Sequence, residues 1–206
     1  MAEKRLAVVA HAGKKLGGGL GELRRLLAQA GHPAPIRYEV SKSRKAPKAV
    51  RRAVKKGARL IFIRGRDGMV QHCVDALAGT KKVEIAIVPV GTANLLATNL
   101  GIPRQIAGAV AIGLRGAGRR IDVGVVNGER FAVMAGAGFD AIMMRNVDAA
   151  AKKRLGRLAY FRSSVQAMRA KAVLTVRAPR SPDAAPKAAP IVRARNQDPG
   201  PAQKKS

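Results

Sequence analysis

The stretch LIFIRGRDGMVQ, residues 60–71, carries the pattern that decides the fold. Four apolar residues are followed by two glycines, Gly65 and Gly68, which enclose an arginine and an aspartate before a second apolar run begins. A short apolar run that ends in a glycine-bearing turn and continues with helical periodicity is typical of a buried strand followed by a helix. Because glycine lets backbone N–H groups approach an anion closely, the turn is also a candidate phosphate-binding loop.

The same alternation of strand and helix patterns recurs throughout the first half of the chain. The apolar runs occupy residues 6–10, 36–40, 60–63 and 85–90, and each is followed by a helical pattern. The clearest helix covers residues 20–30 and ends at Gly31. This repetition predicts an α/β layer fold with a mainly parallel sheet, which we expect to span residues 1–118.

The pattern changes after a helix expected near residues 105–114. Two strands are predicted around Asn127 and Gly128, a dipeptide that strongly favours a hairpin. A helix and one more strand at 172–176 follow, so we expect residues 119–177 to form an incomplete β-rich domain with helices. Six of the 11 prolines lie beyond residue 177, and residues 178–206 are therefore predicted to be a disordered tail.

The composition limits the classes of function. The chain has 40 Lys and Arg against 12 Asp and Glu, a net charge of +28, which favours anionic partners such as nucleotides, nucleic acid or acidic lipid head groups. The single cysteine, Cys73, excludes an intrachain disulfide, and its spacing from the histidines does not match a zinc site. Aromatic residues make up only 3%, which argues against specific nucleic-acid binding by base stacking. No signal peptide or apolar membrane span is recognisable, so the predicted location is cytoplasmic.

Two loops at the predicted carboxyl ends of strands are candidates for chemistry. They are Gly65–Met69 and Pro89–Asn94, and in a parallel sheet they would lie side by side and face one pocket. Asp67 fits such a pocket if Mg²⁺ lies between its carboxylate and a phosphate, or if it accepts a proton. Thr92 and Asn94 could cap the next helix or hydrogen-bond a nucleotide. Taken alone, each loop could equally be a plain turn with a helix-capping residue.

Several motifs together resemble the diacylglycerol kinase catalytic-domain family of lipid kinases. The family motif Gly-Gly-Asp-Gly-Thr is similar to residues 65–69, and Pro-x-Gly-Thr-x-Asn is matched by residues 89–94. Further segments resemble the family in the same order: NLGIP (99–103), RIDVGVVNG (120–128), AGAGFDA (135–141) and KRLGRLAY (153–160). An NAD-kinase-like protein would share the Gly-Asp-Gly turn, but these further segments favour the lipid kinases.

The resemblance implies a nucleotide-binding domain, with ATP and Mg²⁺ as cofactors and transfer of the γ-phosphoryl group to a lipid hydroxyl, such as that of diacylglycerol, in phospholipid biosynthesis. The residues to which it gives nucleotide contacts, or a place near them, are Ser41, Gly65, Arg66, Asp67, Gly68, Met69, Gly91, Thr92 and Asn94. It implies that Asp67 is the acid nearest the metal and the reaction. Asp122 either supports it or is an ordinary acid at a strand edge. The alternative is a truncated, inactive relative that binds nucleotide or anionic membrane without turnover, since no general base can be named.

The chain also departs from the family motifs. Arg66 replaces a glycine, and if its φ had to be positive the substitution would cost about 1 kcal/mol, so that Arg66→Gly would raise ATP affinity. An arginine could compensate in part by pairing with a phosphate. Met69 occupies a position where threonine is commonest, and Leu95 one where many members have aspartate.

Residues 42–56 contain eight positive charges. They are either a solvated helix face or a surface for peripheral attachment to anionic lipid, where each basic residue contributes about 1 kcal/mol.

Overall fold

The computed structural model describes residues 5–13, 19–80, 82–91, 93–121, 123–126, 129–132 and 191–194. Internal contacts divide the chain into a first compact unit, residues 1–133 with 186–206, and a second unit, residues 134–185. The predicted boundary after residue 118 therefore lies inside the first unit. The second unit lies outside the described residues, as do the helix and the strand at 172–176 that the sequence predicts there.

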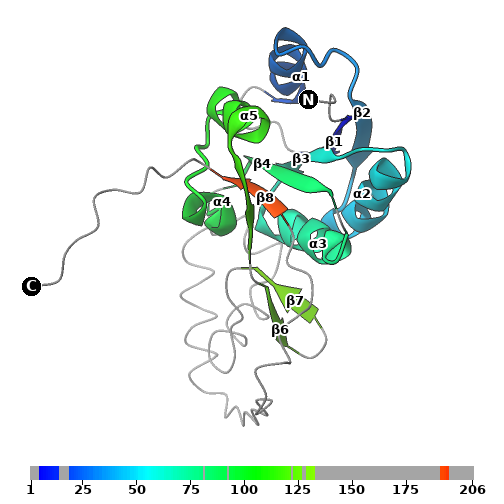
Figure 1. Cartoon of the computed structure of the whole chain (residues 1–206), viewed down its shortest axis with the longest axis vertical. Coiled ribbons are helices and arrows are strands. Elements are labelled where there is room, and N and C mark those ends of the chain that lie inside the picture. The colour runs from blue at the N-terminus through cyan, green and yellow to red at the C-terminus, as the bar shows by residue number, and fades with distance from the viewer. Residues whose placement is uncertain are drawn as a thin grey trace, which may run out of the picture. The chain divides into compact units, whose positions relative to one another are not determined.

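A six-stranded sheet forms the centre of the first unit (Figure 1). Its strands are β1 (Leu6–His11), β2 (Ile36–Val40), β3 (Leu60–Gly65), β4 (Glu84–Pro89), β5 (Ala117–Arg120) and β8 (Ile191–Ala194). Their order is β2-β1-β3-β4-β8-β5, and every pairing is parallel except that of β5 with β8. The predicted mainly parallel sheet is confirmed. Its order reverses between β1 and β3, the point where open α/β sheets bind ligands at the carboxyl ends of their strands.

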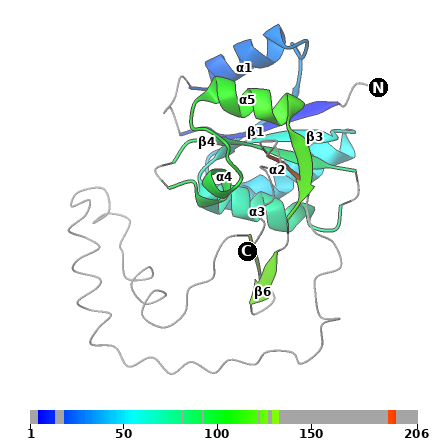
Figure 2. The same ribbon diagram turned by 60° about the vertical axis from the view of Figure 1, so that its left-hand side comes forward.

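Helices cover both faces of the sheet, as Figure 2 shows. Helices α1 (Gly19–Gln29) and α5 (Ile106–Arg115) pack together on one face, and α2 (Ala46–Lys55) and α3 (Asp67–Leu77) pack together on the other. A short 3-10 turn, η1 (Ser43–Lys45), precedes α2, and α4 (Leu95–Asn99) follows β4. Within the described residues, no helix is long and apolar enough to cross a bilayer.

Strands β1, β3 and β4 are buried on both sides, which explains why their sequences are almost continuously apolar. Helix α5 lies unusually close to β3. A Cβ atom at Gly113 would come within 2.4 Å of Cε1 of Phe62, a distance that no real contact allows, so this helix packs on the sheet through a residue without a side chain.

Strand β8 corrects one prediction. Residues 191–194 lie within the segment 178–206 that the proline content predicted to be disordered, yet they pair with both β4 and β5. The reason is local: Val192 is completely buried, and the guanidinium of Arg193 donates from Nε to Glu84 Oε2 at 2.5 Å and from Nη1 to the carbonyl of Gly116. The proline content of a 29-residue segment does not reveal a four-residue strand that is held by one completely buried residue. The remainder of the segment lies outside the described residues.

The predicted hairpin is present as β6 (Gly124–Val126) and β7 (Glu129–Phe131), which pair antiparallel on either side of Asn127 and Gly128. This two-stranded sheet belongs to the first compact unit.

Candidate functional site

The two glycine-bearing loops lie side by side at the carboxyl edge of the sheet, as the sequence predicted. Gly65, the last residue of β3, is in register with Pro89, the last residue of β4, and the N–H of Val90 donates to the carbonyl of Gly65 at 3.2 Å. Each loop therefore starts from a buried strand and reaches the surface at the same edge. The parallel pairing of β3 and β4 sets the position of the two loops, because the carboxyl ends of the two strands lie in register at the same edge of the sheet.

Asp67 connects the two loops. It is the first residue of α3, and its Oδ2 accepts a hydrogen bond of 2.9 Å from the backbone N–H of Asn94. The carboxylate is half-buried, and no other described residue donates to it. Asp67 is thus more than a helix-capping residue: its negative charge is held at the junction of the loops, at the positive end of an 11-residue helix.

Asn94 braces the second loop. Its backbone is left-handed, with φ 52° and ψ 51°, a conformation that asparagine tolerates better than most residues. Its Oδ1 accepts from the N–H of Gly91 at 2.9 Å and its Nδ2 donates to the carbonyl of Gly91 at 2.6 Å. Asn94 is only 3% exposed and both polar atoms of its side chain are bonded within the loop, so in this structure it holds the shape of the loop. The predicted contact between Asn94 and a nucleotide stays a prediction.

The same brace explains why position 91 is glycine. A Cβ atom there would come within 2.7 Å of Asn94 Oδ1 and 3.3 Å of Arg66 Cγ. Any larger residue would therefore force apart the Asn94 side chain and the first loop.

Met69 is a core residue, and its predicted contact with a cofactor stays a prediction. Its side chain is completely buried, and its N–H donates to the carbonyl of Arg66. A Cβ atom at Gly65 would come within 2.7 Å of Met69 Sδ, so the glycine is required by the methionine that packs over it. The first loop is thus anchored in the core by the contact between Gly65 and Met69.

Arg66 is accommodated without backbone strain. Its φ is −88° and its ψ is 171°, an extended conformation open to any residue. The condition for strain, a positive φ at Arg66, is not met, so Arg66→Gly would relieve no backbone strain. The residue is exposed, and its Cβ and Cγ lie beside Gly91, so the side chain of Arg66 starts at the junction of the two loops.

The first turn of α3 is open to an approaching anion. Gly68 is exposed, and a Cβ atom at this position would meet nothing within 4 Å. Within the described residues no group of three or more acids, histidines or cysteines could hold a metal ion by itself. Mg²⁺ is usually bound by one or two carboxylates together with substrate phosphates and water, so Asp67 fits the protein ligand of such an ion.

The other predicted residues are placed as follows. Ser41 is exposed directly after β2, at the same edge of the sheet but on the far side of β1. Thr92 and Asp122 lie outside the described residues.

Arg64 was missed by sequence reasoning. It is a charged residue in an apolar strand, one position before Gly65, and it is only 1% exposed; burial lowers the pKa of its guanidinium. The sequence signal that could have identified it is a charged residue at the end of the otherwise apolar strand LIFIRG, residues 60–65. Arg64 and Asn94 are the polar residues buried among those described, and both lie near the carboxyl edge. In contrast, burial raises the pKa of Cys73 to about 12, so this thiol is not a nucleophile at neutral pH.

Helix α3 also holds the β6–β7 hairpin. The side chain of Gln71 donates from Nε2 to the carbonyl of Arg130, and its Oε1 accepts from the N–H of Ala132 at 3.1 Å. One turn further along, Asp75 Oδ1 lies 3.2 Å from Arg130 Nη1. The amide of Gln71 thus pairs with β7 much as a neighbouring strand would, and the helix that carries Asp67 is attached directly to the hairpin.

A parallel α/β sheet with two braced glycine loops at its carboxyl edge defines the class of the domain, and comparison with known proteins specifies the family. Residues 5–126, more than half of the chain, match the family model of the diacylglycerol kinase catalytic domain. The chain belongs to this family.

Individual relatives agree with this assignment. A Pseudomonas aeruginosa protein named "Probable lipid kinase YegS-like" is 39% identical over 116 residues, which cover 56% of this chain and 38% of that protein. The diacylglycerol kinase of Bacillus subtilis is 38% identical over 104 residues, covering 50% and 34%. A crystal structure of a diacylglycerol kinase from Bacillus anthracis has 25% identity and a TM-score of 0.54, covering 64% of this chain and 49% of that one. The matched region thus spans between about a third and a half of each relative.

Proposed function

We propose that this protein binds Mg-ATP at the paired glycine loops and transfers its γ-phosphoryl group to a lipid hydroxyl, such as that of diacylglycerol, as a peripheral protein on the cytoplasmic side of a membrane in phospholipid biosynthesis. The single observation that carries the proposal is the Asp67 carboxylate, held at the junction of the two loops by the N–H of Asn94. Membership in a lipid kinase family supports the reaction class.

The loops supply the positioning on which phosphoryl transfer largely depends. The phosphates would approach the exposed first turn of α3 at Gly68, where the free N–H groups and the helix dipole favour an anion. Arg66 would add a positive charge from the mouth of the loops. Gly91 has no side chain, so the second loop would not obstruct a nucleotide bound at the first loop.

Asp67 would hold the metal. When bound, Mg²⁺ neutralises charge on the phosphate oxygens of ATP. The hydrogen bond from Asn94 fixes the orientation of the carboxylate before the nucleotide arrives, so its negative charge needs no rearrangement to meet the ion. Ser41, Thr92 and Asp122 are proposed to complete the nucleotide and metal site, as the family resemblance implies.

The test is the isosteric variant Asp67→Asn. Because an amide oxygen can still accept the hydrogen bond from Asn94, the variant removes the charge and keeps the loop geometry. We expect Mg-dependent ATP binding to weaken by about 10- to 100-fold, and labelled phosphate transfer to a mixed lipid extract to be lost. Asp75→Asn is the matched control, since it neutralises an acid on the same helix away from the loops, and it should retain binding.

Each outcome has a distinct meaning. Unchanged Mg-ATP affinity in Asp67→Asn would refute the proposed metal ligand. Tight Mg-ATP binding by the unmodified chain, with no transfer to any lipid, would support the alternative of a relative that binds nucleotide without turnover. Failure to bind ATP at all would reject the proposed function altogether.

A further inference from the structure

The outer surface of α2 and η1 is a continuous cationic ridge, formed by Lys42, Arg44, Lys45, Lys48, Arg51, Arg52, Lys55 and Lys56. All eight side chains are exposed, and there is no acidic residue between Glu39 and Asp67 in the sequence. None of the eight forms an ion pair with another described residue. The ridge is thus a concentrated charge that the described part of the protein does not neutralise.

The helix is divided strictly into two faces. Ala46, Ala49, Val50 and Ala53 follow the spacing i, i+3, i+4, i+7 and are all buried. Lys48, Arg51, Arg52 and Lys55 follow the same spacing on the opposite face and are all exposed. Since the apolar face is already used in the core, this helix cannot insert into a bilayer as an interfacial amphipathic helix does. Any partner of the exposed face must be recognised by charge alone.

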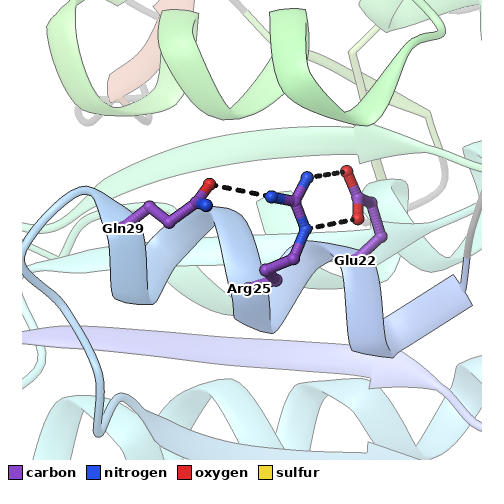
Figure 3. A network of polar contacts seen from close by, with 3 residues as sticks. All are labelled: Glu22, Arg25 and Gln29. Atoms are coloured by element: carbon purple, nitrogen blue, oxygen red, sulfur yellow. Dashed lines mark hydrogen bonds and ion pairs between the residues drawn. The ribbon is translucent and has the colours of Figure 1, made fainter.

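Helix α1 shows what an ordinary charged surface looks like in the same protein. In Figure 3, the guanidinium of Arg25 binds both oxygens of Glu22, at 2.8 and 3.0 Å, and the side-chain oxygen of Gln29 at 3.0 Å. The neighbouring Arg24 pairs with Glu39 on β2. The exposed cations of α1 are therefore paired within the protein, whereas those of α2 pair with no acid in the part of the chain that the structure describes.

The ridge begins beside the candidate site. Turn η1 follows the carboxyl end of β2 and contacts α3, the helix whose first turn carries Asp67 and Gly68. From there α2 runs back along the sheet for its 10 residues, about 15 Å. A flat anionic surface lying on the ridge would thus meet the protein at the edge where the two glycine loops open.

We propose that the α2–η1 ridge docks the protein on the anionic head groups of a bilayer by electrostatic attraction without insertion, and so places the site at the surface that holds its lipid acceptor. The choice of a membrane rests on the proposed lipid kinase function, but docking itself requires no turnover. Nucleic acid is the less favoured partner, because no residue of the ridge is aromatic and, among the described residues, its one ring contact is that of Lys56 Nζ, 5.8 Å from the Tyr38 ring centre.

The experiment compares two quadruple variants of the full chain by sedimentation with vesicles. The ridge variant carries Lys48→Gln, Arg51→Gln, Arg52→Gln and Lys55→Gln. The control carries Lys82→Gln, Arg115→Gln, Arg119→Gln and Arg120→Gln, which lie outside the ridge, are exposed and form no ion pair with described residues. Both variants reduce the net charge by the same amount, 28 − 4 = +24. Glutamine retains good helix propensity.

We expect the unmodified chain to bind phosphatidylcholine vesicles containing about one third phosphatidylserine, and to dissociate in about 0.5 M salt. The ridge variant should lose affinity by about 100-fold or more, at roughly five-fold per cation, whereas the control should lose less than about ten-fold. Surface pressure of a lipid monolayer should not rise on binding.

Several results would overturn the proposal. Equal losses in the two variants would mean that net charge alone is responsible. Binding to pure phosphatidylcholine, or a rise in monolayer pressure, would mean that apolar insertion occurs. Tighter binding to duplex RNA than to the vesicles, abolished by the ridge variant, would assign the ridge to nucleic acid. The sedimentation assay contains no ATP, so the two proposals can fail independently: failure of the unmodified chain to bind ATP, with intact vesicle binding, would reject the kinase proposal and leave docking unaffected.

Discussion

Helices α1 and α2 have similar lengths, 11 and 10 residues, and lie on opposite faces of the same sheet, yet they use their charges in opposite ways. In α1, Glu22 and Gln29 surround Arg25, and Glu39 holds Arg24. In α2, the four cations of the outer face have no acid within reach among the described residues. The difference indicates that a high net charge alone does not identify a binding surface. The docking proposal rests instead on a cluster of cations that have no counter-charge among the described residues.

The inward faces of the two helices should behave alike, and this is where the largest effects on stability are expected. Leu27 of α1 and Val50 of α2 are both completely buried. Leu27→Ala should lower the free energy of unfolding by about 2–5 kcal/mol, since it leaves a cavity. Val50→Ala should lower it by roughly 1.5–3 kcal/mol, since two buried methyl groups are removed. Urea unfolding measures both; a loss below about 0.5 kcal/mol in either would mean that the helix is not anchored in the core.

The outward faces can be made alike by giving α2 the acids that α1 already has. In the double variant Lys48→Glu and Arg51→Glu, each glutamate lies four residues before a cation, Arg52 or Lys55, the favourable order for a helical ion pair. Binding to anionic vesicles should fall by about 100-fold, while the helix should gain a few tenths of a kcal/mol. Vesicle sedimentation and urea unfolding report the two effects. Retained vesicle binding would show that the comparison between the helices has no functional meaning.

The smallest expected effect concerns the paired charges of α1. The hydrogen bond from Arg25 holds the pKa of the Glu22 carboxyl below its ordinary value. A group with a lowered pKa contributes stability above its unfolded pKa and loses that contribution as the pH falls through the folded pKa. Because Arg25 is exposed and Glu22 is partly exposed to solvent, the effect on unfolding should be too small to resolve. NMR titration should nevertheless show a depressed pKa for Glu22, which returns to the ordinary value in Arg25→Gln; an unchanged titration would mean that the pair does not form in solution.

Most of the α/β domain could be predicted because its strands and helices have sequence patterns that extend over only a few neighbouring residues. The apolar runs that became β1, β2, β3 and β4 are bounded by turn residues, and their helices have clear periodicity. Strand β8 could not be predicted in this way. Its assignment depends on Val192 and Arg193 meeting β4, β5 and Glu84, all distant in the sequence.

The candidate site shows the same division. The motifs located both loops, and parallel pairing was sufficient to predict that they meet. The roles of individual side chains required coordinates. Only the coordinates show that Met69 lies in the core, that Asn94 turns back onto Gly91, and that Arg66 has an extended backbone. Gln71 gave no local sign that its amide would bind β7.

The sequence by itself determined the fold class, the family and the two loops, because these depend on short-range periodicity, on glycine positions and on motif order. Only the tertiary structure decided which acid joins the loops, which glycines are required by a neighbouring side chain, and which cations remain without a partner. These properties arise between residues far apart in the chain: Asp67 meets Asn94, Arg24 meets Glu39, and the ridge of α2 meets no described acid. Charge in a sequence is a count, whereas charge on a folded surface depends on which opposite charge the fold brings near.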